Sequence, residues 1–404
     1  MISVDEALAI VLGGVKRLPS EQVSVAQALG RVLAVDVASR LTQPPKAVSA
    51  MDGYAVRAAD VAKVPAKLKQ IGESAAGSGY TGAIGSGQTV RIFTGAPLPE
   101  GADAIVIQED TDADGNTITI KESVKAGRYV RPAGLDFRTG EVLLPAGTLL
   151  TARDVALLAG MNVPWVQVTR KPRVAILSTG DELVMPGESL GDDQIISSNS
   201  VGLQAFVTAL GGEPINLGIA RDNVDSLKNH LAGVNGADLL VTIGGASVGD
   251  YDLVRDVLGE EGLEISFFTV AMRPGKPLIF GHIYGTPFLG LPGNPVSAGV
   301  TTVLFVRPAM NVMLGLEAGP EHPETAVLGR DLEANDKRQD YLRAELSVNA
   351  KGELTVTPFA KQDSSMLALF TKADCLAIRP PFAPEAKAGD KIEIIRLIHG
   401  TVSI

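Results

Sequence analysis

Five carboxylates lie in short polar loops of residues 171–314, and each loop follows an apolar segment. They are Asp181, Glu182, Asp222, Asp250 and Asp252. The same region holds a glycine-rich loop, Gly244-Gly-Ala-Ser-Val-Gly249, whose backbone N–H groups can approach an anion closely. Carboxylates beside such a loop would repel an anion unless a cation lies between them. We therefore expect a hard, oxygen-ligated ion such as Mg²⁺, held by Asp222, Asp250 and Asp252. Asp222 and Asp250 could instead be helix N-caps.

Two proline-containing turns carry further candidate ligand groups. Arg273 and Lys276 flank a Pro-Gly pair, and two such cations are either solvated or placed to contact an oxyanion. In Pro292-Gly-Asn-Pro295, capping chemistry alone explains Asn294 as an N-cap and Pro295 as the first helical residue. The rigid Pro-Gly turn ahead of them is what favours a ligand, and the two interpretations weigh evenly.

The elements that would position these loops alternate between strand and helix. Strands are predicted at residues 173–177, 215–219, 238–243 and 287–291, and helices at 199–210, 224–231 and from 295 to 306. This alternation is typical of a central doubly wound α/β domain with a parallel sheet and right-handed crossovers. Ligands of such sheets bind at the carboxyl ends of the strands, so the polar loops should gather along one edge.

The flanking segments are predicted to form three further modules. Residues 1–43 show two helices with capping boxes, Ser3/Glu6 and Ser24/Gln27, then a strand at 32–37. Together with residues 138–170 they form a discontinuous α/β domain around an inserted β domain at 44–137. Residues 320–404 form a C-terminal β-barrel-like domain. The predicted strands of the two β domains are 67–71, 89–93, 104–108 and 116–120, then 341–348, 353–358, 375–379 and 391–397.

Composition excludes several classes of function. The net charge of −10 over 404 residues argues against nucleic acid as a partner. We expect no membrane association, since no apolar run reaches the length of a membrane span. The single cysteine, Cys375, fits a cytoplasmic protein without a disulfide framework, and four scattered histidines give no zinc-type spacing. The N-terminal capping box predicts a helix, not a signal peptide.

Six strings, in order along nearly the whole chain, together resemble the molybdopterin molybdenumtransferase family, which includes MoeA and the E domain of gephyrin. They are Met51-Asp-Gly-Tyr-Ala55, Phe93-Thr-Gly-Ala-Pro97, Ser178-Thr-Gly-Asp-Glu-Leu183, Gly244-Gly-Ala-Ser-Val-Gly249, Pro274-Gly-Lys-Pro277 and Gly290-Leu-Pro-Gly-Asn-Pro-Val-Ser297. Each string alone is weak, but the combination is specific. The resemblance implies an elongated four-domain subunit and a homodimer.

The resemblance also implies an enzyme of molybdenum cofactor biosynthesis. Such an enzyme inserts molybdate into adenylylated molybdopterin and releases AMP, with Mg²⁺. The family's functional positions correspond here to Asp52, Thr94, Asp136, Glu182, Asp222, Asp252 and Lys276. The anion-binding positions correspond to Ser178, Thr179, Gly180, Gly244, Gly245, Ser247, Gly249, Arg273, Pro292, Gly293, Asn294, Pro295, Arg343, Ser364 and Ser365. Because Asp52 and Thr94 lie in the insertion, the resemblance implies that they complete the partner's site.

The chain departs from the family pattern at two places. A basic residue common ahead of Ala271 is Thr269 here, and a Gly-Ser pair reads Asp363-Ser364. Two other functions stay open: a molybdopterin adenylyltransferase, which shares the central domain, and a non-catalytic scaffold. The sequence does not distinguish molybdate from tungstate as the substrate. A molybdopterin adenylyltransferase and molybdoenzyme acceptors are the expected protein partners.

Overall fold

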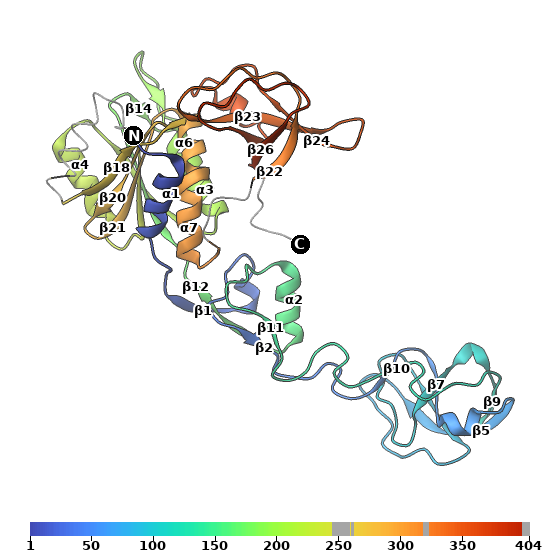
Figure 1. The fold of residues 1–404 in the computed structure, drawn as a ribbon. Coiled ribbons are helices and arrows are strands. Elements are labelled where there is room, and N and C mark those ends of the chain that lie inside the picture. Colours follow the sequence, from blue (N-terminus) through green and yellow to red (C-terminus); the bar gives the residue numbers. More distant parts are fainter. Residues whose placement is uncertain (245–258, 260–261, 318–322, 398–404) are drawn as a thin grey trace. The chain divides into compact units, whose positions relative to one another are not determined.

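The computed structural model describes residues 1–244, 259, 262–317 and 323–397 (Figure 1). The chain divides into two compact units. The first comprises Met1–Val35, Ala146–Arg153 and Gln167–Ile404, and the second comprises Asp36–Pro145 and Asp154–Val166. Each is described below by itself.

The first unit is built on a six-stranded sheet with the order β16-β13-β17-β21-β20-β18. The strands are β13 (Arg173–Thr179), β16 (Glu213–Ala220), β17 (Leu239–Ile243), β18 (Glu264–Thr269), β20 (Pro277–Ile283) and β21 (Thr286–Leu291). The first four strands in this order are parallel, as predicted, but β20 runs antiparallel to both of its neighbours. The prediction of a wholly parallel sheet was therefore wrong. The reversal brings the start of β20, and the turn before it, to the edge where the parallel strands end.

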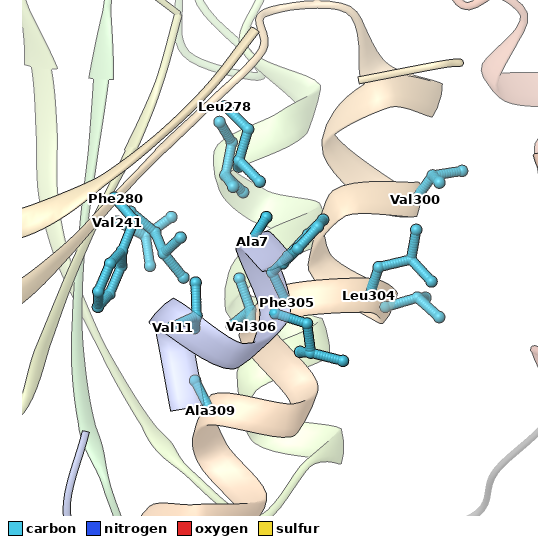
Figure 2. Packing of buried hydrophobic residues seen from close by; sticks show 14 of the residues in the cluster. Ala7, Val11, Val241, Leu278, Phe280, Val300, Leu304, Phe305, Val306 and Ala309 are labelled. Carbon is cyan, nitrogen blue, oxygen red and sulfur yellow. The ribbon is translucent and has the colours of Figure 1, made fainter. Parts of the chain in front are cut away.

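Helices cover both faces of this sheet, which confirms the doubly wound α/β class. On one face, α1 (Val4–Gly13), α3 (Ser198–Ala209) and the helical run from Pro295 to Leu314 share a core with Val241 and Phe280. Figure 2 shows Ala7 and Val11 of α1 packed beside Phe305 and Val306 in this core. On the other face, α4 (Val224–Leu231) and η4 (Ala232–Val234) pack on Ala175 and Leu240.

The run from Pro295 continues past the predicted end at Val306. It consists of α6 (Pro295–Thr301), a π-helical turn η5 (Thr302–Val306) and α7 (Arg307–Leu314). Pro308 has no N–H to donate to the preceding turn, and the wider π turn ahead of it lets the helix continue. The run is long and apolar enough to cross a membrane, contrary to the prediction, yet 89% of its most apolar window is buried, as in a core helix.

The C-terminal part of the first unit is a closed barrel. Its sheet has the order β19-β23-β24-β22-β26-β25, and β25 also pairs with β23. The strands are β19 (Met272–Arg273), β22 (Glu324–Leu328), β23 (Gln339–Val348), β24 (Leu354–Pro358), β25 (Cys375–Arg379) and β26 (Lys391–Arg396). All four predicted strands are present, and β22 was missed. β19 joins the barrel to the turn before β20, because Arg273 pairs with Asp340 of β23.

The second unit holds a six-stranded sheet with the order β7-β4-β6-β5-β9-β8. The strands are β4 (Gly53–Val56), β5 (Ala66–Ser74), β6 (Gln88–Ile92), β7 (Ala104–Ile107), β8 (Thr111–Asp114) and β9 (Thr117–Ile120). The four predicted strands are confirmed. β4 was missed because an Asp-Gly pair such as Asp52-Gly53 is typical of a turn. Gly53 is instead buried in the sheet, where a Cβ would lie 2.0 Å from the Val106 carbonyl oxygen.

Segments from the two sides of the insertion pair with each other. In the second unit, β2 (Val37–Ala38) pairs with β11 (Val142–Leu144), and in the first unit Val32 and Leu33 form bridges to Leu149 and Val168. The capping box of Ser3 and Glu6 is confirmed. The second predicted helix is wrong: only a short 3₁₀ turn, Val25–Gln27, follows Ser24, whose hydroxyl bonds the Gln27 side chain instead of the backbone.

Candidate functional site

A cleft of about 790 Å³ lies in the first unit at the carboxyl ends of the parallel strands. Thirteen of the predicted site residues line it: Ser178, Thr179, Gly180, Glu182, Asp222, Gly244, Arg273, Lys276, Pro292, Gly293, Asn294, Pro295 and Ser364. Gly245, Ser247, Gly249, Asp250 and Asp252 lie outside the described residues. These thirteen residues therefore gather at the edge where the topological rule for open α/β sheets places a ligand.

The ends of β13 and β17 form one wall of the cleft and include a buried hydroxyl. Thr179 is 3% exposed, and its Oγ1 has no hydrogen-bond partner among the residues that the structure describes. Gly244 lies directly beside it with φ +95°, and a Cβ there would be 2.6 Å from the Thr179 carbonyl oxygen. Only glycine fits this approach without strain. A buried hydroxyl without a partner carries a free-energy cost that a bound ligand would remove.

The carboxylates of this wall are held by backbone groups. The amides of Asp181 and Asp222 each donate to the other residue's carboxylate, at 3.4 and 3.2 Å. Glu182 folds its carboxylate over Gly180, where a Cβ would lie 2.4 Å from Oε2. Asp222 is not the cap of α4, since Asn223 takes that position and accepts from the Ser226 amide. The capping alternative for Asp222 is thereby excluded.

The two cations of the Arg273–Lys276 turn have different surroundings. Arg273 forms a bidentate pair with Asp340, at 2.8 and 2.5 Å, and its remaining nitrogen is 3.8 Å from Asp336. The hydrogen bonds that Arg273 donates to Asp340 raise the pKa of Arg273. Lys276 is exposed and lines the cleft. Arg273 therefore anchors the turn to the barrel, and Lys276 is the better placed of the two to meet an anion.

Asn294 occupies the N-cap position of α6, as predicted, but its side chain does not cap the helix. Its amide nitrogen donates to the Ser364 hydroxyl at 2.9 Å, and the Val296 amide donates to the Ser364 carbonyl at 3.0 Å. Asn199 of α3 donates to the Gly293 carbonyl at 2.6 Å. The Pro292–Pro295 turn is thus fixed between a helix and a barrel loop, which capping chemistry alone does not explain.

Arg343 lies behind the cleft instead of lining it. Its side chain is only 2% exposed, and its guanidinium donates to the Asp363 carbonyl oxygen at 3.1 Å. Burial lowers the pKa of Arg343, while the nearby Asp363 carboxylate acts in the opposite direction. The Gln362 side chain holds the Arg343 backbone by accepting from its amide and donating to its carbonyl, both at 3.0 Å. A buried guanidinium that bonds a backbone carbonyl retains donors for an anion.

The second unit joins two of the predicted residues of the insertion, Asp52 and Thr94. Both the amide and the hydroxyl of Thr94 donate to Oδ1 of Asp52, at 2.7 and 2.8 Å, and these bonds lower the pKa of Asp52. Asp136 lines a pocket of about 560 Å³ that also includes Gly95, the residue after Thr94. The loop that carries Thr94 and Gly95 therefore reaches Asp52 through direct hydrogen bonds and shares a pocket with Asp136 through Gly95.

Sequence reasoning missed several residues that shape the cleft. Asp340 was passed over although it lies only three residues before Arg343. Gln362 has a role that depends on a tertiary contact with no local signal. Others that line the cleft are Asn199, Ser297 and Arg338.

The described part of this edge offers two carboxylates, Asp181 and Asp222, to a hard cation. Carboxylate oxygens of the Asp181–Asp222 pair are ligands that Mg²⁺ prefers. Within the described ranges, no group of three or more histidine, cysteine, aspartate or glutamate side chains is arranged to hold a metal ion. Asp222 is the one predicted ligand that can be placed.

Comparison with known proteins gives matches over nearly the whole chain. Three family profiles match: the MoeA N-terminal region (domain I and II) at residues 2–161, a probable molybdopterin binding domain at 175–312, and the MoeA C-terminal region (domain IV) at 325–397.

Curated relatives and a solved structure agree with these profiles. A molybdopterin molybdenumtransferase of Nostoc sp. is 41% identical over 86% of this chain and 82% of its own length, and that of Haemophilus influenzae is 34% identical over 99% of each. The crystal structure of the molybdopterin biosynthesis MoeA protein from Pyrococcus horikosii superposes with a TM-score of 0.86, at 34% identity, covering 99% of this chain and 100% of that one. The chain belongs to the molybdopterin molybdenumtransferase family and is an enzyme of molybdenum cofactor biosynthesis.

Proposed function

We propose that the chain inserts molybdate into adenylylated molybdopterin and releases AMP in a Mg²⁺-dependent reaction. The observation that carries this proposal is the single cleft that joins two kinds of anion site. One is the strand-end wall of Thr179 and Gly244, and the other is Lys276 with the barrel loop around Ser364. A phosphate and a molybdate bound in one cleft can be coupled by proximity.

The roles of the residues follow from their surroundings. The Thr179 hydroxyl and the backbone at Gly244 would hold phosphate, and Lys276 and Arg343 would neutralise molybdate. Most of the rate enhancement would come from positioning and from stabilising negative charge, as in phosphoryl transfer generally.

Mg²⁺ would be held by Asp222 with Asp250 and Asp252. Bound there, it would neutralise the charge that builds up on the pyrophosphate as the adenylate bond breaks. Asp222→Asn should therefore raise the Mg²⁺ concentration needed for half-maximal activity by about ten-fold, while leaving the molybdate requirement nearly unchanged. Full turnover in excess chelator would rule out the metal.

Two predicted site residues of the insertion favour a dimeric enzyme. Asp52 and Thr94 are held together in the second unit, yet they belong to a different unit from the cleft. We infer a cytoplasmic homodimer in which this surface completes the partner's site. A molybdopterin adenylyltransferase would supply the substrate, and molybdoenzymes would accept the product.

One experiment separates this function from its alternatives. The protein is incubated with molybdopterin, ATP and Mg²⁺, and separately with adenylylated molybdopterin, molybdate and Mg²⁺. Turnover only in the second mixture supports insertion. Turnover in the first would identify an adenylyltransferase, and no turnover in either would point to a scaffold.

A further inference from the structure

A carboxylate of the chain itself occupies donors in the proposed molybdate pocket. Asp363 is exposed and lines the cleft. Its Oδ1 accepts from the Ser365 amide at 2.8 Å and from the Ser365 hydroxyl at 2.6 Å. An amide and a hydroxyl pointing at one negative oxygen are the donors that a tetrahedral oxyanion would use.

The same carboxylate lies within the electrostatic field of Arg343, the buried cation behind the cleft. Arg343 donates to the Asp363 carbonyl, and the two side chains act on each other's ionisation. Gln362 fixes the loop by bonding the Arg343 backbone and the Phe359 carbonyl. The backbone of Asp363 is therefore fixed beside Arg343, and its exposed carboxylate is held by Ser365.

We propose that Asp363 is an intramolecular competitor for oxyanions and sets the affinity of this pocket; the inference rests on the proposed function. An arriving molybdate carries two negative charges, and the carboxylate repels it while holding the Ser365 donors. Molybdate binding therefore either proceeds against this charge or displaces the carboxylate from Ser365. Asp363 itself does not enter the chemistry.

The alternative is that the Asp363 side chain only stabilises a local turn by accepting from Ser365, with no effect on ligands. Two variants separate this structural role from the competitor role. Asp363→Asn keeps an acceptor oxygen for Ser365 and removes the charge, whereas Asp363→Glu keeps the charge. Titration calorimetry of the full chain with sodium molybdate should show about ten-fold tighter binding for Asp363→Asn. This is the size of the Coulomb effect of one charge on a dianion a few ångströms away in water. Asp363→Glu should bind no more tightly than the parent.

The same titrations distinguish a failure of this inference from a failure of the proposed function. Arg343→Ala is titrated alongside: if it binds molybdate as the parent does, the pocket itself is wrongly assigned. If Arg343→Ala loses binding but Asp363→Asn is unchanged or weaker, only the competitor role is overturned. Equal tightening by the Asn and Glu variants would also overturn it, because charge would then not be the cause. Should the parent bind too weakly to measure, binding must appear in Asp363→Asn, and its absence contradicts the inference. Asp363→Ala, which needs no side-chain turn, replaces Asp363→Asn if that variant does not fold.

Discussion

At the scale of single residues, the chemical role of a side chain was easier to predict than its contact partners. Asn294 was correctly placed at an N-cap position, because capping follows from neighbours in the chain. Its actual partner, Ser364, lies 70 residues away, so no local pattern could indicate it. Arg273 and Lys276 were likewise identified as a cationic pair, but only the buried Asp340 shows that Arg273 is already paired.

Arg343 gives the clearest prediction at this scale. A hydrogen bond to a charged group contributes roughly 1.5–3 kcal/mol, so Arg343→Ala should weaken molybdate binding about ten- to a hundred-fold. AMP binding should change little, because the strand-end wall is formed by other residues. Calorimetric titration with each ligand measures both effects. Arg396→Ala, which breaks an exposed pair with Glu324, is the control and should change neither. A loss of AMP affinity as large as the loss of molybdate affinity would refute the proposal of separate anion sites.

Asp52 gives a prediction for ionisation. The hydrogen bonds from Thr94 stabilise the carboxylate and lower its pKa, so Asp52 stays charged at a pH where an ordinary aspartate is partly protonated. Thr94→Val removes the hydroxyl bond and should raise the pKa of Asp52 towards its usual value. Any stabilisation of the fold from this pair is fully present when the pH is above the usual pKa of an aspartate. It is lost as the pH falls through the lowered pKa of Asp52. Carbon-detected NMR titration of the side chain checks the direction, and an unchanged or lower pKa would contradict it.

At the scale of elements, the strongest sequence signals were the buried parallel strands and the capping box of α1. The errors fell where tertiary structure decides. β4 begins at an Asp-Gly pair that is a turn signal in isolation, yet sheet neighbours on both sides hold it extended. The β20–β21 hairpin replaces a crossover, and strand composition alone does not give direction.

The C-terminal barrel contains the chain's single cysteine, which can report on its integrity. Cys375 is buried at the start of β25, and burial raises its pKa to about 12. The thiolate needed for alkylation is therefore almost absent at neutral pH. A maleimide reagent should leave the native protein unlabelled for hours and modify one thiol per chain in denaturant, as counted by mass spectrometry. Rapid labelling of the native chain would show that the barrel opens readily or is not closed as described.

At the scale of the whole molecule, assembly is tested by complementation. An Asp52→Ala subunit and an Asp222→Ala subunit carry lesions in different units of the chain. If sites are shared between protomers, a heterodimer retains one intact site of its two, so each heterodimer should have up to about half of the activity of a parent dimer. Each variant alone should stay inactive. Purified heterodimers without activity, verified by two affinity tags, would argue that each site belongs to one chain.

The central claim is that one cleft couples cleavage of the adenylate to metal insertion, and its most direct test is stoichiometry. AMP released and molybdenum incorporated are measured together, with adenylylated molybdopterin and Mg²⁺ present and molybdate titrated from zero. The account predicts that AMP release is slow without molybdate, rises with it, and matches the incorporated molybdenum one to one. AMP release at the same rate without molybdate, or molybdenum incorporated without AMP, would contradict it.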